Sequence, residues 1–302
     1  MTAGTGIVWI ILAAVAVILI MAAVIEIYRE LHYFVVTHYE IHPEKLSGTG
    51  SSVRIVFLSD LHNKVYGEKN DVLYRAVKRE KPDMILIGGD MLVGKEDVSY
   101  RPALEFVRKL PDICPVFYAN GNHEQRMKEE PEQYKYSYKK YKESLKRYGV
   151  RFLENESASV RMKGINFVVS GLELPLDSYR KFSKSSVTST DLTRQLGFEP
   201  SASKQSIYSS YHILLAHNPS YMKAYKEWGA DLILSGHLHG GMVRLPGIGG
   251  VITPQAFLFP RYSGEMREEG QQTVIVSRGL GTHTINLRLF NSAEVVSLKL
   301  GE

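Results

Sequence analysis

Cysteine is almost absent from this chain of 302 residues, whose single thiol is Cys114. A lone cysteine excludes an intramolecular disulfide, and it excludes a zinc or iron–sulfur site built from several thiolates. Any metal that the chain binds must therefore be held mainly by histidine and carboxylate side chains.

A strong net charge is also missing. The 37 Lys and Arg residues only slightly outnumber the 32 Asp and Glu residues, and the two signs are interspersed along the chain. Nucleic-acid-binding domains usually gather basic residues in a patch or stripe, so nucleic acid is not the expected partner. The hydrophobic fraction of 44% and the charged fraction of 23% exclude a globally disordered chain.

One long hydrophobic run stands out near the N-terminus. Residues 7–25 are apolar throughout and contain no charge or proline. As a helix they would span roughly 28 Å, close to the ~30 Å hydrocarbon core of a bilayer. No Lys or Arg precedes the run, and it exceeds the ~7–15 apolar residues of a signal peptide. We therefore predict an uncleaved single-span anchor, with a cleaved signal peptide as the alternative.

This run predicts three parts of the chain: a transmembrane anchor over 1–28, a juxtamembrane connector over 29–52 and a folded domain over 53–302. The connector ends in a Ser, Gly and Thr run, so it is expected to be flexible. Arg29 follows the apolar run and no basic residue precedes it. The positive-inside rule then places the domain on the cytoplasmic side of the cell membrane.

From residue 53 onward, short apolar runs alternate with amphipathic segments. Strands are expected at 53–58, 84–87 and 116–119, with helices over about 71–80 and 102–110 between them. This alternation is typical of a largely parallel sheet. Later runs joined by short turns predict a second, more antiparallel sheet, with strands at 160–162, 166–170, 212–216, 232–234, 273–276 and 294–300.

Two further segments have less regular patterns. A Lys- and Tyr-rich segment over 131–148 is expected to be a helix with a solvated face. The stretch 177–206 is dense in Ser, Thr and Lys and shows no sustained periodicity. It is expected to be an insertion that forms a loop or lid.

Potential metal ligands follow five of the expected strands. They are Asp60 with His62, Asp90, Asn122, His217, and His237 with His239. Because the carboxyl ends of parallel strands gather in one crevice, these side chains are expected to meet there. Carboxylate, imidazole and amide oxygen ligands suit Mn, Fe or Zn. Two such ions about 3.5–4 Å apart need an anionic bridge and lower the pKa of water from 15.7 toward about 7.

The order of these motifs is more informative than any single one. Asp-x-His or Gly-Gly-Asp at a strand end is common and usually forms only a turn. Five such blocks in one chain, each placed at the end of an expected strand, are an improbable coincidence. The blocks are Asp60-x-His62, Gly89-Asp90, Gly121-Asn122-His123-Glu124, Ala216-His217 and Gly236-His237-x-His239.

The ordered blocks resemble the signature of the calcineurin-like metallophosphoesterases over about residues 53–300. The resemblance implies an α/β fold, a four-layer αββα sandwich, here preceded by one transmembrane helix. It also implies a metal-dependent hydrolase of phosphoric esters or pyrophosphates that holds two divalent ions (Mn, Fe or Zn) per chain. The family's first metal would be held by Asp60, His62 and His239. The second would be held by Asn122, His217 and His237, with Asp90 bridging the two ions.

The resemblance also suggests which residues act on the substrate. His123 would lie over the leaving group and serve as its general acid. Glu124 would either orient an imidazole or be an exposed loop acid. Arg278 and Arg244 are candidates for phosphate contacts because guanidinium groups pair bidentately with phosphate oxygens. His283 is a candidate for the wall of the substrate cleft.

Three longer blocks, together with the apolar run, are similar to a membrane-associated bacterial branch of the family, typified by the YkuE-like phosphoesterases and a UDP-diacylglucosamine pyrophosphate hydrolase. The blocks are Ala216-His217-Asn218-Pro219, Ser235-Gly236-His237-Leu238-His239-Gly240-Gly241 and Ser277-Arg278-Gly279-Leu280-Gly281. Met242 departs from the branch, which often has Gln there, and this leaves the substrate open.

The expected function is hydrolysis of a phosphodiester or pyrophosphate at the bilayer surface. A nucleotide-linked lipid such as UDP-diacylglucosamine is one candidate substrate. The alternatives are a phosphoesterase or nuclease acting on a soluble nucleotide or nucleic acid, and a non-catalytic metal-binding membrane scaffold. The expected partners are the lipid bilayer and a phosphate-containing substrate. No obligate protein partner is expected.

Overall fold

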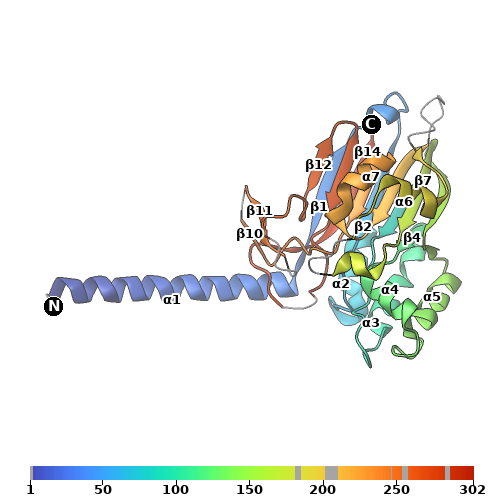
Figure 1. Ribbon diagram of the computed structural model, residues 1–302. Coiled ribbons are helices and arrows are strands. Elements are labelled where there is room, and N and C mark those ends of the chain that lie inside the picture. The colour runs from blue at the N-terminus through green and yellow to red at the C-terminus, as the bar shows by residue number, and fades with distance from the viewer. Residues whose placement is uncertain (1–2, 181–184, 201–209, 246, 254–257, 283–285) are drawn as a thin grey trace.

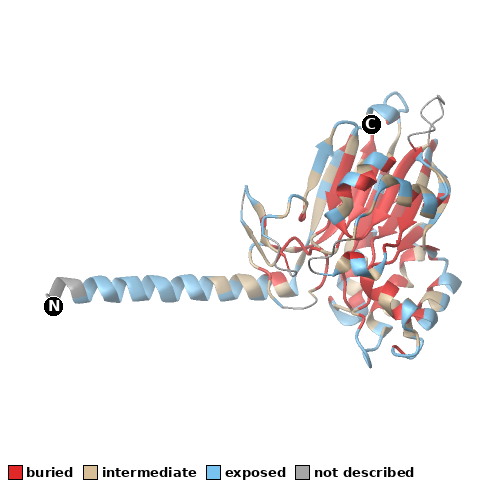
Figure 2. Cartoon of the chain, viewed as in Figure 1, coloured by how far each residue is buried: buried red, intermediate tan, exposed pale blue. Residues whose placement is uncertain are grey.

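The computed structural model describes residues 3–180, 185–200, 210–245, 247–253, 258–282 and 286–302. It begins with a long helix, α1 (Ala3–His32), which projects away from the rest of the chain (Figure 1). The side chains of this helix are largely exposed along residues 7–25 (Figure 2). Within the described residues, one helix is long and apolar enough to cross a membrane, and it covers Gly6–His32.

Two six-stranded sheets form the body of the molecule. The first has the order β1-β14-β2-β3-β4-β5, with strands at Phe34–Ile41, Ala293–Gly301, Ser52–Leu58, Met84–Ile87, Val116–Ala119 and Arg151–Leu153. The second has the order β12-β13-β9-β8-β7-β6, with strands at Met266–Glu269, Gln272–Val276, Leu232–Ser235, Tyr211–Ala216, Ile165–Leu172 and Glu156–Met162. A separate hairpin, β10 (Val243–Leu245) with β11 (Gly249–Ile252), lies beside the end of α1 (Figure 1).

Helices pack on the outer face of each sheet. Those on the first sheet are α2 (Asp71–Arg79), α3 (Arg101–Val107), α4 (Asn122–Glu129) and α5 (Ser137–Arg147). Those on the second sheet are α6 (Ser189–Leu196) and α7 (Met222–Trp228). Short 3₁₀ helices occur at Glu44–Leu46, Glu68–Asn70, Leu110–Asp112, Leu176–Tyr179 and Pro219–Tyr221.

Alternation of apolar side chains along the strands explains the layers. In β2, Ile55 and Phe57 point into the core between the sheets, whereas Val56 and Leu58 pack against the helices of the first sheet. A strand whose two faces are both covered must be apolar on both faces, and this is why β2 is an almost continuous hydrophobic run. The order of layers is αββα, as the sequence predicted.

The structure differs from expectation in the segment 29–52. Helix α1 continues to His32, and residues 34–41 form β1, which pairs in parallel with β14 at the edge of the first sheet. Part of the expected flexible connector is therefore built into the sheet. The apolar pattern of β1 is interrupted by Thr37, His38 and Glu40, because a strand at the edge of a sheet has exposed positions. For this reason the sequence pattern did not predict the strand.

Two other expectations need correction. The strand expected at 294–300 is β14 of the first sheet and not part of the second. The second sheet is the more antiparallel of the two, with the pairs β6–β7 and β12–β13 against β14–β2 alone in the first, although β7, β8, β9 and β13 are parallel. The stretch 177–206 contains helix α6, which begins with a capping box between Thr188 and Asp191 and ends at Gly197. Only Leu192 and Leu196 of this helix are buried, so its periodicity was too short to be read from the sequence.

Candidate metal centre

The expected ligands meet at one end of the two sheets, because each follows the carboxyl end of a strand. Loops after β2, β3 and β4 provide Asp60, His62, Asp90 and Asn122, whereas loops after β8 and β9 provide His217, His237 and His239. Six of these seven side chains, together with His123, form three overlapping groups whose ligand atoms lie within 4.8 Å of one another. Residues from both halves of the sequence thus share one small volume.

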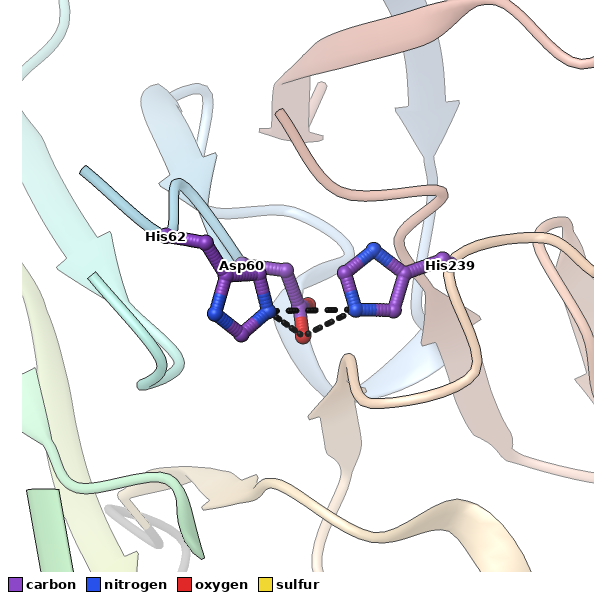
Figure 3. A group of neighbouring side chains, drawn as sticks. All are labelled: Asp60, His62 and His239. Atoms are coloured by element: carbon purple, nitrogen blue, oxygen red, sulfur yellow. Dashed lines mark hydrogen bonds and ion pairs between the residues drawn. The ribbon is translucent and has the colours of Figure 1, made fainter. Parts of the chain in front are cut away.

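The first group consists of Asp60, His62 and His239, all of them buried (Figure 3). The Nε2 atoms of His62 and His239 are 3.2 Å apart. Asp60 Oδ1 lies 3.4 Å from Nε2 of His239 and 3.8 Å from Nε2 of His62. One carboxylate oxygen and two ring nitrogens therefore point at a common centre, as ligands of one ion do.

The second group consists of Asp90, His217 and His237. Asp90 Oδ2 lies 3.1 Å from Nε2 of His217, and it also lies 3.9 Å from Nε2 of His62 in the first group. Asp60 Oδ1 is in turn 3.8 Å from Nε2 of His217. Asp90 thus lies between the two groups.

The charges of the cluster favour a bound cation. Asp60 and Asp90 are almost completely buried, and within the described residues their ion-pair partners are all histidines. Although burial opposes protonation, the charges of Asp90 and Asp60 raise the pKa of His217 to about 10. Buried carboxylates that attract positive charge this strongly are the surroundings that a divalent ion requires.

A buried amide oxygen gives a second indication of metal binding. Asn122 is the first residue of α4, and its buried Oδ1 atom has no hydrogen-bond partner among the residues that the structure describes. Leaving a buried polar atom unpaired costs about 1–3 kcal/mol, so such atoms usually have a partner that the protein itself does not provide. A metal ion fits this position, because amide oxygen is a suitable ligand for hard and borderline ions.

Backbone carbonyl groups fix the orientation of three imidazoles. The Nδ1 atoms lie 3.2 Å, 2.7 Å and 3.0 Å from a carbonyl oxygen in His62, His217 and His239, respectively. Because a carbonyl oxygen only accepts hydrogen bonds, each Nδ1 donates its proton, and Nε2 is the ring atom left to face a metal ion. This second contact is the usual way in which proteins select the tautomer of a metal-binding histidine.

The loops that present the ligands have unusual backbone conformations. Positive φ angles between 48° and 70° occur at Asp60, His62, Asp90, His237 and His239. This left-handed conformation costs roughly 1–2 kcal/mol per non-glycine residue. Gly89 (φ 92°) and Gly121 also pack tightly, since a Cβ atom on Gly89 would lie 2.1 Å from the backbone nitrogen of Gly121. Ligand placement is therefore accompanied by local strain, as it often is at functional sites.

Glu124 supports the loop that holds Asp90. Its carboxylate is fully buried and accepts hydrogen bonds from the backbone nitrogens of Asp90 (2.7 Å) and Leu92 (3.0 Å) and from the Tyr118 hydroxyl (2.9 Å). Burial and the neighbouring Asp90 raise the pKa of Glu124 to about 7. Within the described part of the chain, no hydrogen bond joins Glu124 to an imidazole, and its carboxylate is not an exposed loop acid, so neither role expected from the sequence is seen. Glu124 instead fixes the backbone of the ligand loop.

His123 lies at the edge of the cluster. Its backbone nitrogen donates to Asp90 Oδ1 at 2.9 Å, and its Nε2 atom is 3.8 Å from Asp90 Oδ2. The rings of His123 and His62 meet edge to face with their centroids 5.0 Å apart. The His123 side chain is thus buried against both ligand groups, where it can reach a substrate that binds there.

Comparison with known proteins agrees with this geometry. Residues 53–241 match the sequence profile of the family described as calcineurin-like phosphoesterase. The chain belongs to the calcineurin-like phosphoesterase family. Members of this family are metal-dependent hydrolases of phosphoric esters, and the clustered His and Asp side chains are consistent with a dimetal site.

Individual relatives match most of the chain. Phosphodiesterase YaeI of Escherichia coli (strain K12) is 25% identical over 276 residues, which cover 89% of this chain and 91% of YaeI. The uncharacterized metallophosphoesterase YkoQ of Bacillus subtilis (strain 168) is 26% identical over 247 residues, which cover 80% of this chain and 82% of YkoQ. Among solved structures, TT1561 of Thermus thermophilus covers 75% of this chain and 89% of its own, with 13% identity and a TM-score of 0.45.

Two buried residues of this calcineurin-like phosphoesterase were missed in the sequence. The Asn291 amide donates to the carbonyl oxygen of His239 at 2.7 Å. The Arg288 guanidinium donates to the carbonyl oxygen of Gly281 at 2.7 Å, and this is the oxygen that also contacts Nδ1 of His239. Neither residue belongs to a strand-end motif, and no pattern in the sequence connects it with His239, so only the folded chain could identify these supports.

The substrate-contact candidates have other partners in the structure. Arg278 forms an ion pair with Glu294 at 2.6 Å, and Arg244 forms one with Glu265 at 3.2 Å. Contact of either arginine with substrate phosphate stays a prediction. His283 lies outside the described residues.

Proposed function

We propose that this protein is a membrane-anchored hydrolase of a phosphodiester or pyrophosphate bond that works with two divalent ions. The observation that supports this most strongly is the convergence of two buried carboxylates with imidazole nitrogens from both sheets. In the proposed assignment, the first ion is bound by Asp60, His62 and His239. The second ion is bound by Asn122, His217 and His237, and Asp90 is shared by both.

The residues around the ions have separate tasks in the reaction. Bound divalent ions would lower the pKa of an attacking water and neutralise charge on the phosphoryl oxygens. His123 would donate a proton to the leaving oxygen, because its ring is held beside Asp90 by a backbone hydrogen bond. Glu124 would keep Asp90 in place through the two backbone amides that it binds.

The proposed anchor rests on the contacts of α1 as well as on its composition. Near its end, Glu30 is buried and accepts a hydrogen bond from the backbone nitrogen of Asn291 at 2.6 Å. Lys64 donates to the carbonyl oxygen of Leu31 at 2.7 Å. These contacts join the last turns of α1 to the domain, so a retained helix would be fixed in direction relative to the metal-site loops. The proposed location of the domain is the cytoplasmic face of the cell membrane.

A pocket beside the cluster supports an amphiphilic substrate. It has a volume of about 690 Å³, and Leu238, which separates His237 from His239 in the sequence, forms part of its wall. Its wall also contains apolar and cationic residues, among them Pro219, Met222, Lys223, Leu258 and Arg261, and the hydroxyl-bearing residues Ser220, Thr253 and Tyr262. Such walls suit a molecule with a hydrocarbon part and a phosphate. A nucleotide-linked lipid such as UDP-diacylglucosamine is the proposed example.

The test is a substrate panel on the full-length protein in lipid nanodiscs, reconstituted separately with Mn²⁺, Fe²⁺ and Zn²⁺. We expect metal-dependent hydrolysis of nucleotide-linked lipids to exceed that of soluble nucleotides and of nucleic acid. Preference for a soluble nucleotide or for nucleic acid would reject the lipid substrate but keep the hydrolase. Complete lack of turnover with every metal would favour the non-catalytic scaffold.

A further inference from the structure

Five exposed apolar side chains among the described residues define a surface that we call the collar. They are Leu245, Ile248, Leu258, Phe259 and Phe290, whose exposed fractions range from 40% to 64%. Large apolar side chains that gather on one surface usually mark a site of contact with a protein or a membrane. The collar residues lie far apart in the sequence, so their proximity has to be established from the backbone contacts.

The first contact joins α1 to the segment that contains Phe290. Glu30, in the last turns of α1, accepts hydrogen bonds from the Asn291 backbone nitrogen at 2.6 Å and from the Ser292 hydroxyl at 3.2 Å. Phe290 directly precedes Asn291 and has 55% of its surface exposed. Phe290 is therefore held next to the place where α1 joins the domain.

Further backbone contacts extend from this segment to the hairpin. The Arg244 nitrogen donates to the Leu289 carbonyl oxygen at 3.0 Å, and the Leu289 nitrogen donates to the Met242 carbonyl oxygen at 3.1 Å. Strand β10 pairs with β11, and the Phe259 nitrogen donates to the Val251 carbonyl oxygen at 2.9 Å. These hydrogen bonds form one connected layer from the end of α1 to Phe259, and Figure 1 shows the hairpin beside this end.

The position of α1 indicates what covers the collar. Residues 7–25 of α1 are apolar and exposed, and the helix is continued by β1 of the first sheet after a single residue, Tyr33. The domain therefore has little freedom to turn away from the helix. Tyr28 and Tyr33 are both exposed at the collar end of α1, where aromatic residues commonly mark the membrane interface.

We infer that the collar inserts into the interfacial layer of the bilayer that α1 spans, and that it holds the metal-site loops at the lipid surface. The link to the site is direct, because the Asn291 amide donates to the carbonyl oxygens of His239 and Gly241. This inference rests on the proposed anchoring by α1. It adds a second membrane contact, which places the site close to phosphate groups of lipid-borne molecules.

The experiment measures the depth of single side chains in the bilayer. Full-length protein is prepared with Cys114→Ser as background, and Ile248→Cys or Phe290→Cys is labelled with the environment-sensitive fluorophore NBD. Tyr148→Cys is the matched control, because Tyr148 is also an exposed aromatic residue but directly follows α5, on the side away from α1 (Figure 1). Each protein is placed in phosphatidylcholine–phosphatidylglycerol vesicles with or without doxyl-labelled lipids.

At both collar positions we expect blue-shifted emission and quenching by shallow doxyl groups that is several-fold stronger than at Tyr148. Iodide in the water should quench the control most strongly. Collar probes that behave like the control would overturn the inference. Blue-shifted collar probes without quenching by doxyl lipids would also overturn it, because the cover would then be a second copy or another part of the protein. Hydrolysis of the lipid panel is measured separately, so failure of the collar does not depend on failure of the proposed function.

Discussion

The carboxylate of Glu124 accepts a hydrogen bond from the backbone nitrogen of Asp90 at 2.7 Å, and it thereby fixes a side chain that lies between the two ligand groups. The same carboxylate holds the nitrogen of Leu92 at 3.0 Å. Both amides lie in the loop after β3, whose backbone would otherwise have unpaired donors in a buried place. Placement of Asp90 therefore depends on α4, which contains Glu124 and begins at the expected ligand Asn122.

Glu124→Ala should weaken metal binding by about 10–100-fold, which is the usual effect of losing a residue that orients a ligand. Glu124→Gln should lie between Ala and the original residue, because its amide offers one acceptor oxygen but turns a donor toward the second backbone nitrogen. Competition titration with a metal chelator measures both affinities. Exposed Glu143 provides the control, and Glu143→Gln should bind metal normally. Unchanged affinity in Glu124→Ala would mean that the loop holds its shape without this carboxylate.

His123→Ala should separate metal binding from chemistry. We expect both ions to be retained while the rate falls about 10²–10⁴-fold, the range for a positioned proton donor. The loss should shrink for diesters with a good leaving group, because these need no protonation. Rates for a series of aryl leaving groups provide the measurement. An equal loss across the series would assign His123 to stabilising the phosphoryl group instead of protonating the leaving oxygen.

Glu154 should make stability depend on pH. Although burial opposes ionisation, hydrogen bonds from Lys142 and Tyr138 and the charge of Lys128 lower the pKa of Glu154 to about 2 from its ordinary 4.5. A lowered pKa stabilises the fold above pH 4.5, and this contribution is lost as the pH falls from 4.5 toward 2.

Glu154→Gln should consequently reduce the free energy of unfolding at pH 7 by about 1–3 kcal/mol. The difference from the original protein should diminish below pH 4.5. Denaturant unfolding monitored at several pH values tests this, with exposed Glu143→Gln again as the control. A difference that stays constant with pH would show that Glu154 acts through packing and not through its charge.

Two deletions should separate the effect of losing the membrane anchor from the effect of losing the edge strand β1. Removal of residues 1–28 leaves β1 intact, so hydrolysis of a soluble diester should persist while hydrolysis of a lipid-linked substrate in vesicles falls steeply. Removal of residues 1–45 also deletes β1, which pairs with β14 along its whole length, and both activities should fall with the folded fraction. Circular dichroism and the two assays are compared for each protein. Retention of full lipid activity without residues 1–28 would defeat the proposed role of the anchor.

The sequence predicted those parts of the structure in which local pattern and global fold agree. Strands β2, β3 and β4 are almost continuous apolar runs because both faces of the sheet are covered, and the ligands at their ends were found for this reason. The αββα layers and the family were also predicted, since the ordered blocks at strand ends are specific to that architecture.

The parts that the sequence did not predict depend on contacts between distant segments. Strand β1 has a mixed pattern because it lies at a sheet edge, and it is defined by its pairing with β14, at the opposite end of the sequence. Glu124 was recognised as part of a motif, but its backbone partners in the β3 loop were not. The contact between Glu30 and Asn291 joins two segments without any motif, so only the folded chain reveals that α1 is attached to the metal-site loops.

The number of ions per chain tests the dimetal site most directly, and elemental analysis of the full-length protein with a parallel activity assay measures it. We predict a content that approaches two divalent ions per chain in the active protein. Asp90→Ala should reduce occupancy of both positions, because Asp90 Oδ2 lies within 3.9 Å of imidazole nitrogens from both groups. His239→Ala should chiefly empty the first position. Full activity with one ion per chain, unchanged by further metal, would contradict the dimetal site.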